Sequence, residues 1–286
     1  MSAQDDARSK EDPATSAEST APFEISLGVG QYRIAAKGDL PTGPARVVDL
    51  LPILHQLSDA MTDIGIQEAT SDGKTITCAP HCGACCRQMV PITYSEARLL
   101  VEWMIDLPEE RRMELMARFD AAVARMEESG LLQRLHAYRH GDQDTLRQLG
   151  SDYFDLHIPC PFLEDESCSI HPIRPLRCRD YLVTSSAELC KSPYTSKPSV
   201  IWPPISLFVK LIDFPPEMSA ANTDGSHVRQ WFPMTLMMEW ARSVDAEVAP
   251  TQMSAGNLIN SFFASFAEKP TPAEEPAPGG TFNSPS

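Results

Sequence analysis

Apolar residues recur at helical spacing along much of the chain. Between residues 45 and 65 they repeat every three to four positions, which places them on one face of a helix. Thr93-x-x-Glu96 then has the form of a capping box, and Pro108 occupies a first turn from which a further apolar stripe runs to about residue 130. Additional helices are predicted over residues 131–149, 230–243 and 256–266. The pattern predicts a mainly α fold.

The alternation of apolar and polar residues near the start of the chain has the period of a strand. Residues 23–27 alternate, residues 31–35 alternate again, and Gly28-Val29-Gly30 separates the two runs. Two alternating runs around a short glycine-containing segment are typical of a β-hairpin. We therefore expect a small N-terminal β-hairpin before the first helix.

Prolines are concentrated in the segment from residue 157 to residue 206. Eight of them lie there, so long regular elements are not expected in this segment. An irregular stretch of this length inside a compact domain needs something to hold it. The segment also carries four cysteines, and we expect Pro-rich loops that are stabilised by a metal.

The 286 residues suffice for one globular domain with unstructured ends. Residues 1–21 are acidic and polar, and residues 268–286 are rich in proline, so neither end has the apolar content that offsets the entropy of ordering. We predict disordered tails over these two ranges. A single domain should cover residues 22–267, with a metal-binding core at about 78–190.

The chain contains eight cysteines, and four of them fall within nine residues. Zinc and iron both take thiolate ligands from short chain excursions, which the x3 and x2 spacings of the first group provide. We interpret all eight as candidate metal ligands: Cys78, Cys82, Cys85, Cys86, Cys160, Cys168, Cys178 and Cys190. Disulfides and uncoordinated redox or nucleophilic thiols are the alternatives.

The predicted compartment favours ligation over disulfides. The N-terminus has no basic stretch followed by an apolar run, as an export signal would. The most apolar window, residues 200–214, is interrupted by Pro203, Pro204 and Lys210, so no membrane span is expected. We predict a cytoplasmic protein, whose unligated thiols would be kept reduced.

The formal net charge of −15 opposes attraction to the phosphate backbones of nucleic acids. We therefore do not expect nucleic acid as a partner, whereas a protein partner is possible.

Four thiolates on one divalent ion leave a net charge of about −2, which favours positive groups around the ligands. Four arginines lie beside the cysteines in sequence and are candidates for this role: Arg87, Arg174, Arg177 and Arg179. An exposed basic face with surface ion pairs is the alternative interpretation.

Three segments together carry a family resemblance. They are Cys78-x3-Cys82-x2-Cys85-Cys86-Arg87, Cys160-Pro161-Phe162-Leu163, and the run from Cys168 through Arg174-Pro175-x-x-Cys178-Arg179-x-Tyr181. This string resembles the YkgJ family of zinc- or iron-chelating cysteine-cluster proteins. The resemblance implies a metal site and no substrate. A related pattern in flagellin lysine methylases implies an alternative, an iron–sulfur enzyme that modifies protein side chains.

The chain departs from the family at His171, where the family commonly has tyrosine, so we do not expect His171 to be an inherited ligand. His81 and His157 are expected to be loop residues.

Eight thiols allow two sites of four ligands, one site with free thiols, or a cluster with bridging sulfur. Adjacent Cys85 and Cys86 would point to opposite sides of an extended backbone, which suits two metals. No catalytic motif is present, so the sequence does not decide whether the protein is an enzyme.

Overall fold

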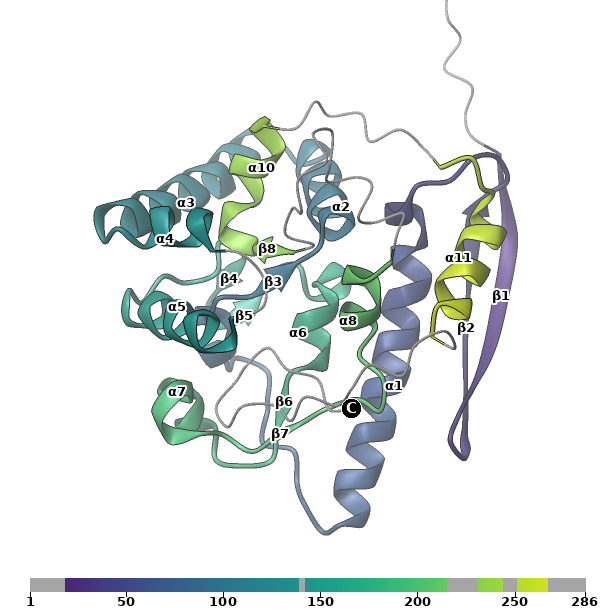
Figure 1. The fold of residues 1–286 in the computed structure, drawn as a ribbon, viewed down its shortest axis with the longest axis horizontal. Coiled ribbons are helices and arrows are strands. Elements are labelled where there is room, and N and C mark those ends of the chain that lie inside the picture. Colours follow the sequence, from purple (N-terminus) through teal and green to yellow (C-terminus); the bar gives the residue numbers. More distant parts are fainter. Residues whose placement is uncertain (1–18, 139–141, 215–230, 244–250, 267–286) are drawn as a thin grey trace, which may run out of the picture.

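The computed structural model describes residues 19–138, 142–214, 231–243 and 251–266. These residues form ten α-helices, one long N-terminal hairpin and several pairs of two-residue strands (Figure 1). The predicted mainly α fold with a small N-terminal hairpin is confirmed. No helix within the described ranges has the length and apolar content that crossing a membrane requires. The predicted tails, 1–21 and 268–286, lie outside the described residues except for residues 19–21.

The N-terminal hairpin pairs β1 (Thr20–Val29) with β2 (Tyr32–Pro41) in antiparallel register, closing at Val29 opposite Tyr32. Gly30 takes φ +57° in the two-residue turn, a conformation that glycine adopts without steric cost. Both strands extend beyond the predicted alternating runs. Alternate residues of β2, including Ile34, Ala36 and Leu40, are buried and face α1.

Helix α1 (Leu51–Ser71) is the long central helix of the molecule, and a 3-10 turn at Val47–Leu50 leads into it. Most of its apolar positions are buried, as the three-to-four-residue period predicts. In Figure 1 it runs between the hairpin on one side and α6 (Leu176–Asp180) with α8 (Leu207–Ile212) on the other. The predicted helix is therefore confirmed, although it starts later and ends later than the pattern suggested.

Helices α2 (Tyr94–Ile105) and α3 (Glu109–Glu128) follow as predicted. The capping box at the start of α2 is present: the Thr93 hydroxyl accepts a hydrogen bond from the Glu96 amide at 3.2 Å, and Glu96 Oε2 accepts one from the Thr93 amide at 2.8 Å. Leu115 and Phe119 are among the residues of α3 that are fully buried. Both helices thus form part of the core.

The single helix predicted over residues 131–149 is wrong, because the chain forms two helices there, α4 (Leu131–Ala137) and α5 (Gln143–Asp155). The chain leaves the helical conformation at Tyr138, and residues 139–141 lie outside the described part. Asp142 then caps the second helix, accepting hydrogen bonds from the amides of Asp144 and Thr145 at 3.1 Å each. The apolar period alone did not reveal this break. We refer to α1–α5 as the helical scaffold.

The helix predicted over residues 230–243 is wrong in its first half. Phe232–Pro233 form β8, which pairs with β3 (Pro91–Ile92), and helical structure begins only with a 3-10 turn at Met234–Leu236 and α10 (Met237–Ser243). Proline cannot donate a helical hydrogen bond, so Pro233 precedes the helix. The last predicted helix is confirmed as α11 (Ala255–Ala264), which a bridge between Pro44 and Ser254 links to the start of the scaffold.

The segment 157–206, here called the Pro-rich region, contains only short elements, as predicted. None is longer than five residues. They are β4 (Leu163–Glu164), β5 (Ser167–Cys168), a 3-10 turn η3 (His171–Ile173), α6, β6 (Leu182–Val183), a second 3-10 turn η4 (Ala187–Lys191), α7 (Pro193–Ser196) and β7 (Val200–Ile201).

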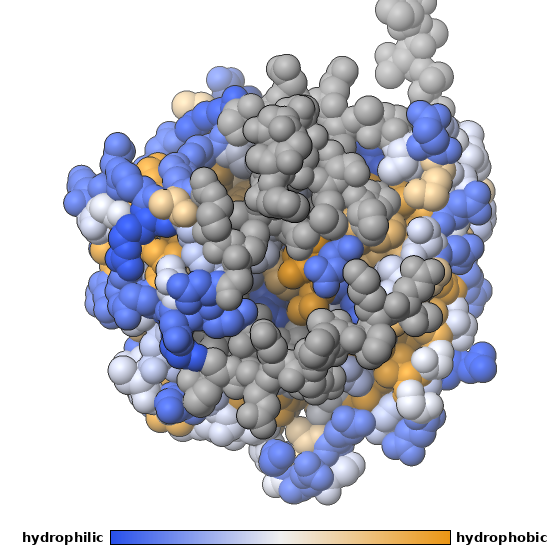
Figure 2. All heavy atoms as spheres, viewed as in Figure 1, coloured by the Kyte–Doolittle hydropathy of each residue, from blue (hydrophilic) through white to orange (hydrophobic). Residues whose placement is uncertain are grey.

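Surface hydropathy differs between the two sides of the view in Figure 2. Hydrophilic side chains predominate over α3, α4 and α5, whereas hydrophobic side chains show on the side of the hairpin and α11. This agrees with the hairpin residues Phe23, Ile25 and Leu27, which pack against the core but are only partly buried. The hairpin therefore contributes part of the hydrophobic surface on this side of the molecule.

Candidate metal centre

The first group of cysteines lies in a loop after α1 that returns to the Pro-rich region. The Thr77 amide donates to the Val183 carbonyl at 3.0 Å, and the Val183 amide donates to Cys78 Sγ at 3.4 Å. Cys85 and Cys86 then sit in a 3-10 turn, η2 (Ala84–Arg87). This part of the chain is thus attached to β6, about 100 residues later in the sequence.

The second pair of cysteines is placed by a tight hairpin. The Cys160 amide donates to the Cys86 carbonyl at 2.7 Å, and Cys168 in β5 pairs with Leu163 in β4. The connecting residues Asp165 and Glu166 have φ values of +47° and +58°, as a two-residue primed turn requires. The hairpin brings Cys160 and Cys168 beside η2.

Close packing and an ion pair fix η2 against this hairpin. A Cβ on Gly83 would lie 2.7 Å from Leu163 Cδ1 and 2.6 Å from a Glu166 carboxylate oxygen, so any larger residue would have to displace the ends of both side chains. Arg87 pairs with Glu166 through both guanidinium nitrogens, at 2.9 and 2.6 Å, and also donates to the Gly83 carbonyl at 2.9 Å. Two cysteine segments that are about 80 residues apart are therefore in direct contact.

The last two cysteines lie on α6 and η4. Helix α6 carries Cys178, and its Leu176 amide donates to the buried carboxylate of Glu96 at 2.6 Å, which joins it to the start of α2. Cys190 is buried in η4, which packs against η2. All eight cysteines are free thiols in the structure.

Charge interactions divide the cysteines into two groups. Cys78, Cys82 and Cys190 lie within electrostatic range of one another. The second group, Cys86, Cys160, Cys168 and Cys178, is linked in the same way. Cys85 interacts with members of both groups. We call the eight residues the cysteine cluster.

Burial favours the protonated thiol at most of these positions. It raises the pKa of Cys160 to about 12, that of Cys190 to about 11, and that of Cys178 well above its ordinary value. Cys86 donates a hydrogen bond to Cys85, which lowers the pKa of Cys85 to about 7 and raises that of Cys86. A cation held by these sulfurs would have to displace their protons.

The donor set fits a zinc or iron centre in its chemistry, because eight sulfurs from four distant stretches of chain lie in one neighbourhood. Among the residues that the structure describes, however, no three His, Cys, Asp or Glu side chains are arranged so that they could hold one metal ion. Coordination would therefore require the cysteine loops to draw closer together.

Three of the four candidate arginines contact carboxylates. Arg87 pairs with Glu166, as described above. Arg179 is buried and donates to both carboxylate oxygens of Asp59 in α1, at 2.8 and 2.6 Å. Arg177 is also buried, with Asp180 at 4.0 Å and the ring of Trp202 at 4.6 Å from its guanidinium carbon. These contacts hold η2 and α6 to their neighbours.

Arg174 is placed differently. It lies within electrostatic range of Cys78, Cys85, Cys168 and Cys178, where it favours the thiolate form. Its Nε atom is buried and has no hydrogen-bond partner within the described ranges. Of the four arginines, it is the one whose position best suits compensation of thiolate charge.

Histidines contribute little to the cluster. His81, His157 and His171 are all exposed, and His81 contacts the carbonyl of Asp165 and the hydroxyl of Ser167 at 3.2 and 3.1 Å. This placement agrees with the loop positions expected for His81 and His157.

Two polar residues near the cluster received no role from the sequence. Gln88 follows η2, and Tyr181 follows α6, where it appeared only as the end of the family motif. Their side-chain Nε2 and Oη atoms are buried without hydrogen-bond partners in the part of the chain that the structure describes. Proximity in sequence to Cys86 and Cys178 was the available signal, but it does not distinguish buried donors from ordinary surface residues.

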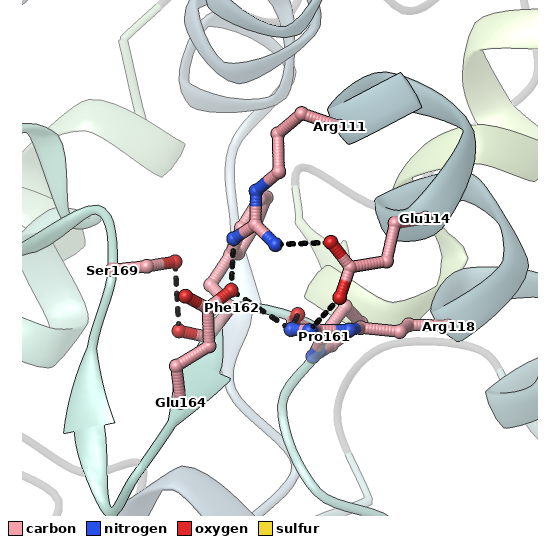
Figure 3. Close-up of polar contacts among 7 residues, drawn as sticks. All are labelled: Arg111, Glu114, Arg118, Pro161, Phe162, Glu164 and Ser169. Atoms are coloured by element: carbon pink, nitrogen blue, oxygen red, sulfur yellow. Dashed lines mark hydrogen bonds and ion pairs between the residues drawn. The ribbon is translucent and has the colours of Figure 1, made fainter. Parts of the chain in front are cut away.

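Helix α3 holds the cysteine hairpin from outside (Figure 3). Arg118 donates to Glu164 at 2.9 Å and to the Pro161 carbonyl at 3.1 Å, and Arg111 also pairs with Glu164. Ser169 closes the hairpin by donating from its amide and hydroxyl to the Phe162 carbonyl, at 2.9 and 3.0 Å. The helical scaffold therefore fixes the segment between Cys160 and Cys168.

Comparison with known families points to the same segment. Residues 77–200 match the family model CxxCxxCC, described as "Putative zinc- or iron-chelating domain". The matched segment is less than half of the chain and contains all eight cysteines. The cysteine-cluster resemblance is thus confirmed over these residues. No curated protein and no solved structure matches the chain.

Proposed function

From the zinc- or iron-chelating domain carried by residues 77–200, we propose that this chain binds zinc or iron through the thiolates of its cysteine cluster. The strongest support is that eight free cysteines lie in one neighbourhood of the fold. They come from residues 78–86, from Cys160 and the adjoining β4–β5 hairpin, from α6 and from η4. Such a concentration of reduced sulfur suits metal ligation better than any other role.

We propose two sites of four ligands. Cys78, Cys82 and Cys190 would be completed by Cys85, and the other site would comprise Cys86, Cys160, Cys168 and Cys178. The two groups of mutually interacting thiols support this division, and a tetrahedral zinc site takes four sulfurs. Adjacent Cys85 and Cys86 would then serve different ions.

The metal has a structural or metal-handling role in this proposal. The Pro-rich region has no element longer than five residues, so ligands on η2, β5, α6 and η4 would connect segments that secondary structure does not connect. Because the described ligands do not converge on one point, binding would draw the loops together around the ion. Ion binding and local folding would therefore be coupled.

We place the protein in the cytoplasm, where glutathione and thioredoxin keep cysteines reduced. The free state of all eight thiols supports this placement. The net charge of −15 disfavours nucleic acid, and a protein that recognises the metal-bound form is the partner class that we propose.

An iron–sulfur enzyme is the second candidate function. Its support is the position of Cys85, which interacts with both groups of cysteines, so that one cluster with bridging sulfur could use ligands from both. The activity in this case would be modification of protein side chains, as in the flagellin lysine methylases that the motif resembles.

Serine variants of one cysteine from each group separate these arrangements. With two independent sites, Cys82→Ser and Cys178→Ser should each reduce the metal content by one ion per chain, and the double variant should hold none. With one shared centre, either single variant should lose the whole centre. Ser167→Ala, which changes an exposed contact to His81, is the control and should keep the full metal content. Full metal content in both cysteine variants would contradict the proposed ligand set.

A further inference from the structure

Three buried hydrogen-bond donors near the cysteine cluster have no acceptor among the described residues. They are Arg174 Nε, Gln88 Nε2 and Tyr181 Oη. Nearly all buried polar atoms in folded proteins have a partner, because an unpaired one loses its hydration without compensation. Three such donors in one neighbourhood indicate acceptors that this arrangement of the loops leaves out of reach.

Two of the donors interact electrostatically with the cysteines. Arg174 is within electrostatic range of Cys78, Cys85, Cys168 and Cys178. Tyr181 is within the same range of Cys78, Cys85 and Cys190.

Gln88 completes this set. Its amide donates to the Cys85 carbonyl at 3.2 Å, and its side chain interacts with the Tyr181 hydroxyl, although no hydrogen bond of ordinary geometry joins the two groups. Arg174 and Tyr181 thus both interact with Cys85, the residue that connects the two groups of thiols, and Gln88 follows Cys85 by three residues.

Two other arginines of the candidate set have carboxylate partners. Arg87, which follows the first cysteines, forms an ion pair with Glu166, and Arg179, five residues after Arg174, forms one with Asp59. Among the described residues Arg174 makes no such contact with a carboxylate, and the titratable groups with which it interacts are cysteine thiols, His55 and His171. Its charge is thus directed to the thiols.

We propose that Arg174, Gln88 and Tyr181 form a donor set that hydrogen-bonds the sulfur atoms of the metal centre. The inference rests on the proposed metal-binding function and names the residues that stabilise its anionic sulfur. Thiolate sulfur accepts N–H and O–H hydrogen bonds, and the guanidinium of Arg174 offsets the negative charge that four thiolates leave on a divalent ion. These are positioning residues, since they act on the metal through its ligands.

The donors should affect the metal and not the polypeptide fold. Tyr181→Phe and Gln88→Met remove one donor each with little change in shape, and Arg174→Met removes the donor and its charge. Metal affinity, measured by competition with a chromogenic chelator, should fall about 10-fold or more in Arg174→Met and by a smaller factor in the other two. After the metal is removed, Tyr181→Phe and Gln88→Met should melt at or above the wild-type temperature, because each lacks an unpaired buried group.

Matched controls are available on the scaffold. Tyr138→Phe removes a hydroxyl that donates to the Asp142 carbonyl at 3.3 Å, and Arg98→Met removes a guanidinium that pairs with Glu102 at 2.7 Å. Both should keep wild-type metal affinity. Arg174→Lys, which keeps the charge but not the planar fork, should lie between wild type and Arg174→Met.

A spectroscopic measurement separates a contact with sulfur from a structural role. In protein loaded with cobalt(II), the sulfur-to-cobalt charge-transfer absorption should shift in Tyr181→Phe and Arg174→Lys and stay unchanged in Tyr138→Phe. Wild-type affinity and spectra in all three donor variants, with wild type still binding metal, would overturn the donor set alone. A wild-type chain that binds neither zinc, iron nor cobalt would overturn the proposed function itself.

Discussion

Helix α1 and the Pro-rich region lie against each other, but their residues are held in different ways. Ile53, Leu54 and Leu57 of α1 are completely buried, and their contacts are apolar. The Pro-rich region buries fewer apolar side chains, such as Phe162 and Leu176, and individual polar contacts hold the rest, such as the bond from the Leu176 amide to Glu96 and the pair between Arg179 and Asp59. Apolar burial therefore stabilises the scaffold without any ligand, whereas the Pro-rich region combines a few buried side chains with specific bonds and, in our proposal, a metal.

The boundary between the two regions combines both kinds of contact. Phe162 of the Pro-rich region packs edge-on against Phe119 and Trp103 of the scaffold, with ring centroids 5.5 and 6.1 Å apart. Directly beside it, Arg111 and Arg118 hold Glu164. The cysteine hairpin is thus anchored on its outer side even before its sulfurs take part in any interaction.

Metal removal should produce the largest difference between the regions. A structural zinc site contributes on the order of 10 kcal/mol to folding of its segment. Chelation should therefore abolish hydrogen-exchange protection in residues 77–90 and 157–201 while amides of α1 and α3 remain protected. Equal loss of protection in both regions would contradict the separation that we describe.

Removal of a core side chain from the scaffold should have the converse effect. Leu54→Ala leaves a cavity at a fully buried position of α1 and should lower the free energy of unfolding by about 2–5 kcal/mol. Metal content per folded chain should stay at the wild-type value. Chemical denaturation and elemental analysis of the same preparation test both parts, with Met113→Ala at a 56% exposed position as the control that changes neither.

Acid should weaken the contact between α1 and α6 through His55. Burial, together with the nearby Arg179 and Arg174, lowers the pKa of His55 from 6.5 to about 3. Between pH 6.5 and pH 3 the imidazole of His55 binds a proton in the unfolded chain but not in the folded chain. The stability that the neutral, buried His55 provides is therefore complete above pH 6.5 and decreases as the pH falls toward 3.

The effect of His55 is at most about 1.4 kcal/mol per pH unit. It is measured as the difference in unfolding free energy between wild type and His55→Leu across this range. The leucine variant should show a shallower loss of stability in acid. Parallel curves for the two proteins would show that His55 has the same pKa in the folded and the unfolded chain, which would contradict this prediction.

The smallest effect is expected at the anchor of the cysteine hairpin. Glu164→Gln removes the charge that Arg111 and Arg118 share, and because all three side chains are partly exposed it should cost less than about 1 kcal/mol of global stability. Amides of residues 163–168 should nevertheless exchange faster than in wild type. Glu128→Gln, at the end of α3, is the control, and unchanged exchange in Glu164→Gln would remove the anchor from our account.

Sequence reasoning succeeded where local chemistry determines the structure. Thr93 and Glu96 form the predicted capping box, and the prolines of residues 157–206 do prevent long elements there. The predicted helix boundaries were wrong where a strand pairing or a new helix cap interrupts a stretch whose apolar residues recur at helical spacing. Phe232 and Pro233 pair with β3 although their surroundings have a helical pattern, and Asp142 starts a new helix inside a stretch that was predicted to be continuous.

The candidate site shows the same limit. The cysteines were identifiable from their spacing, but their division into two groups depends on which loops meet in space. Arg87, Arg174, Arg177 and Arg179 looked alike in the sequence, and only the partners Glu166, Asp180 and Asp59 distinguish Arg174 from the other three. Burial of Gln88 and Tyr181 without partners could not be read from the sequence, since it is a property of the packed chain.

Elemental analysis with a visible absorption spectrum, on protein purified without oxygen, tests the central claim most directly. The accessible thiols should be counted in the folded protein before and after chelation. Our account predicts zinc or iron at one or two ions per chain, with thiols that become reactive only when the metal is removed. Colourless protein with zinc would support the structural or metal-handling site, and brown protein with iron and inorganic sulfide would support the iron–sulfur enzyme. Purified protein without metal, whose eight cysteines all react freely, would contradict the account.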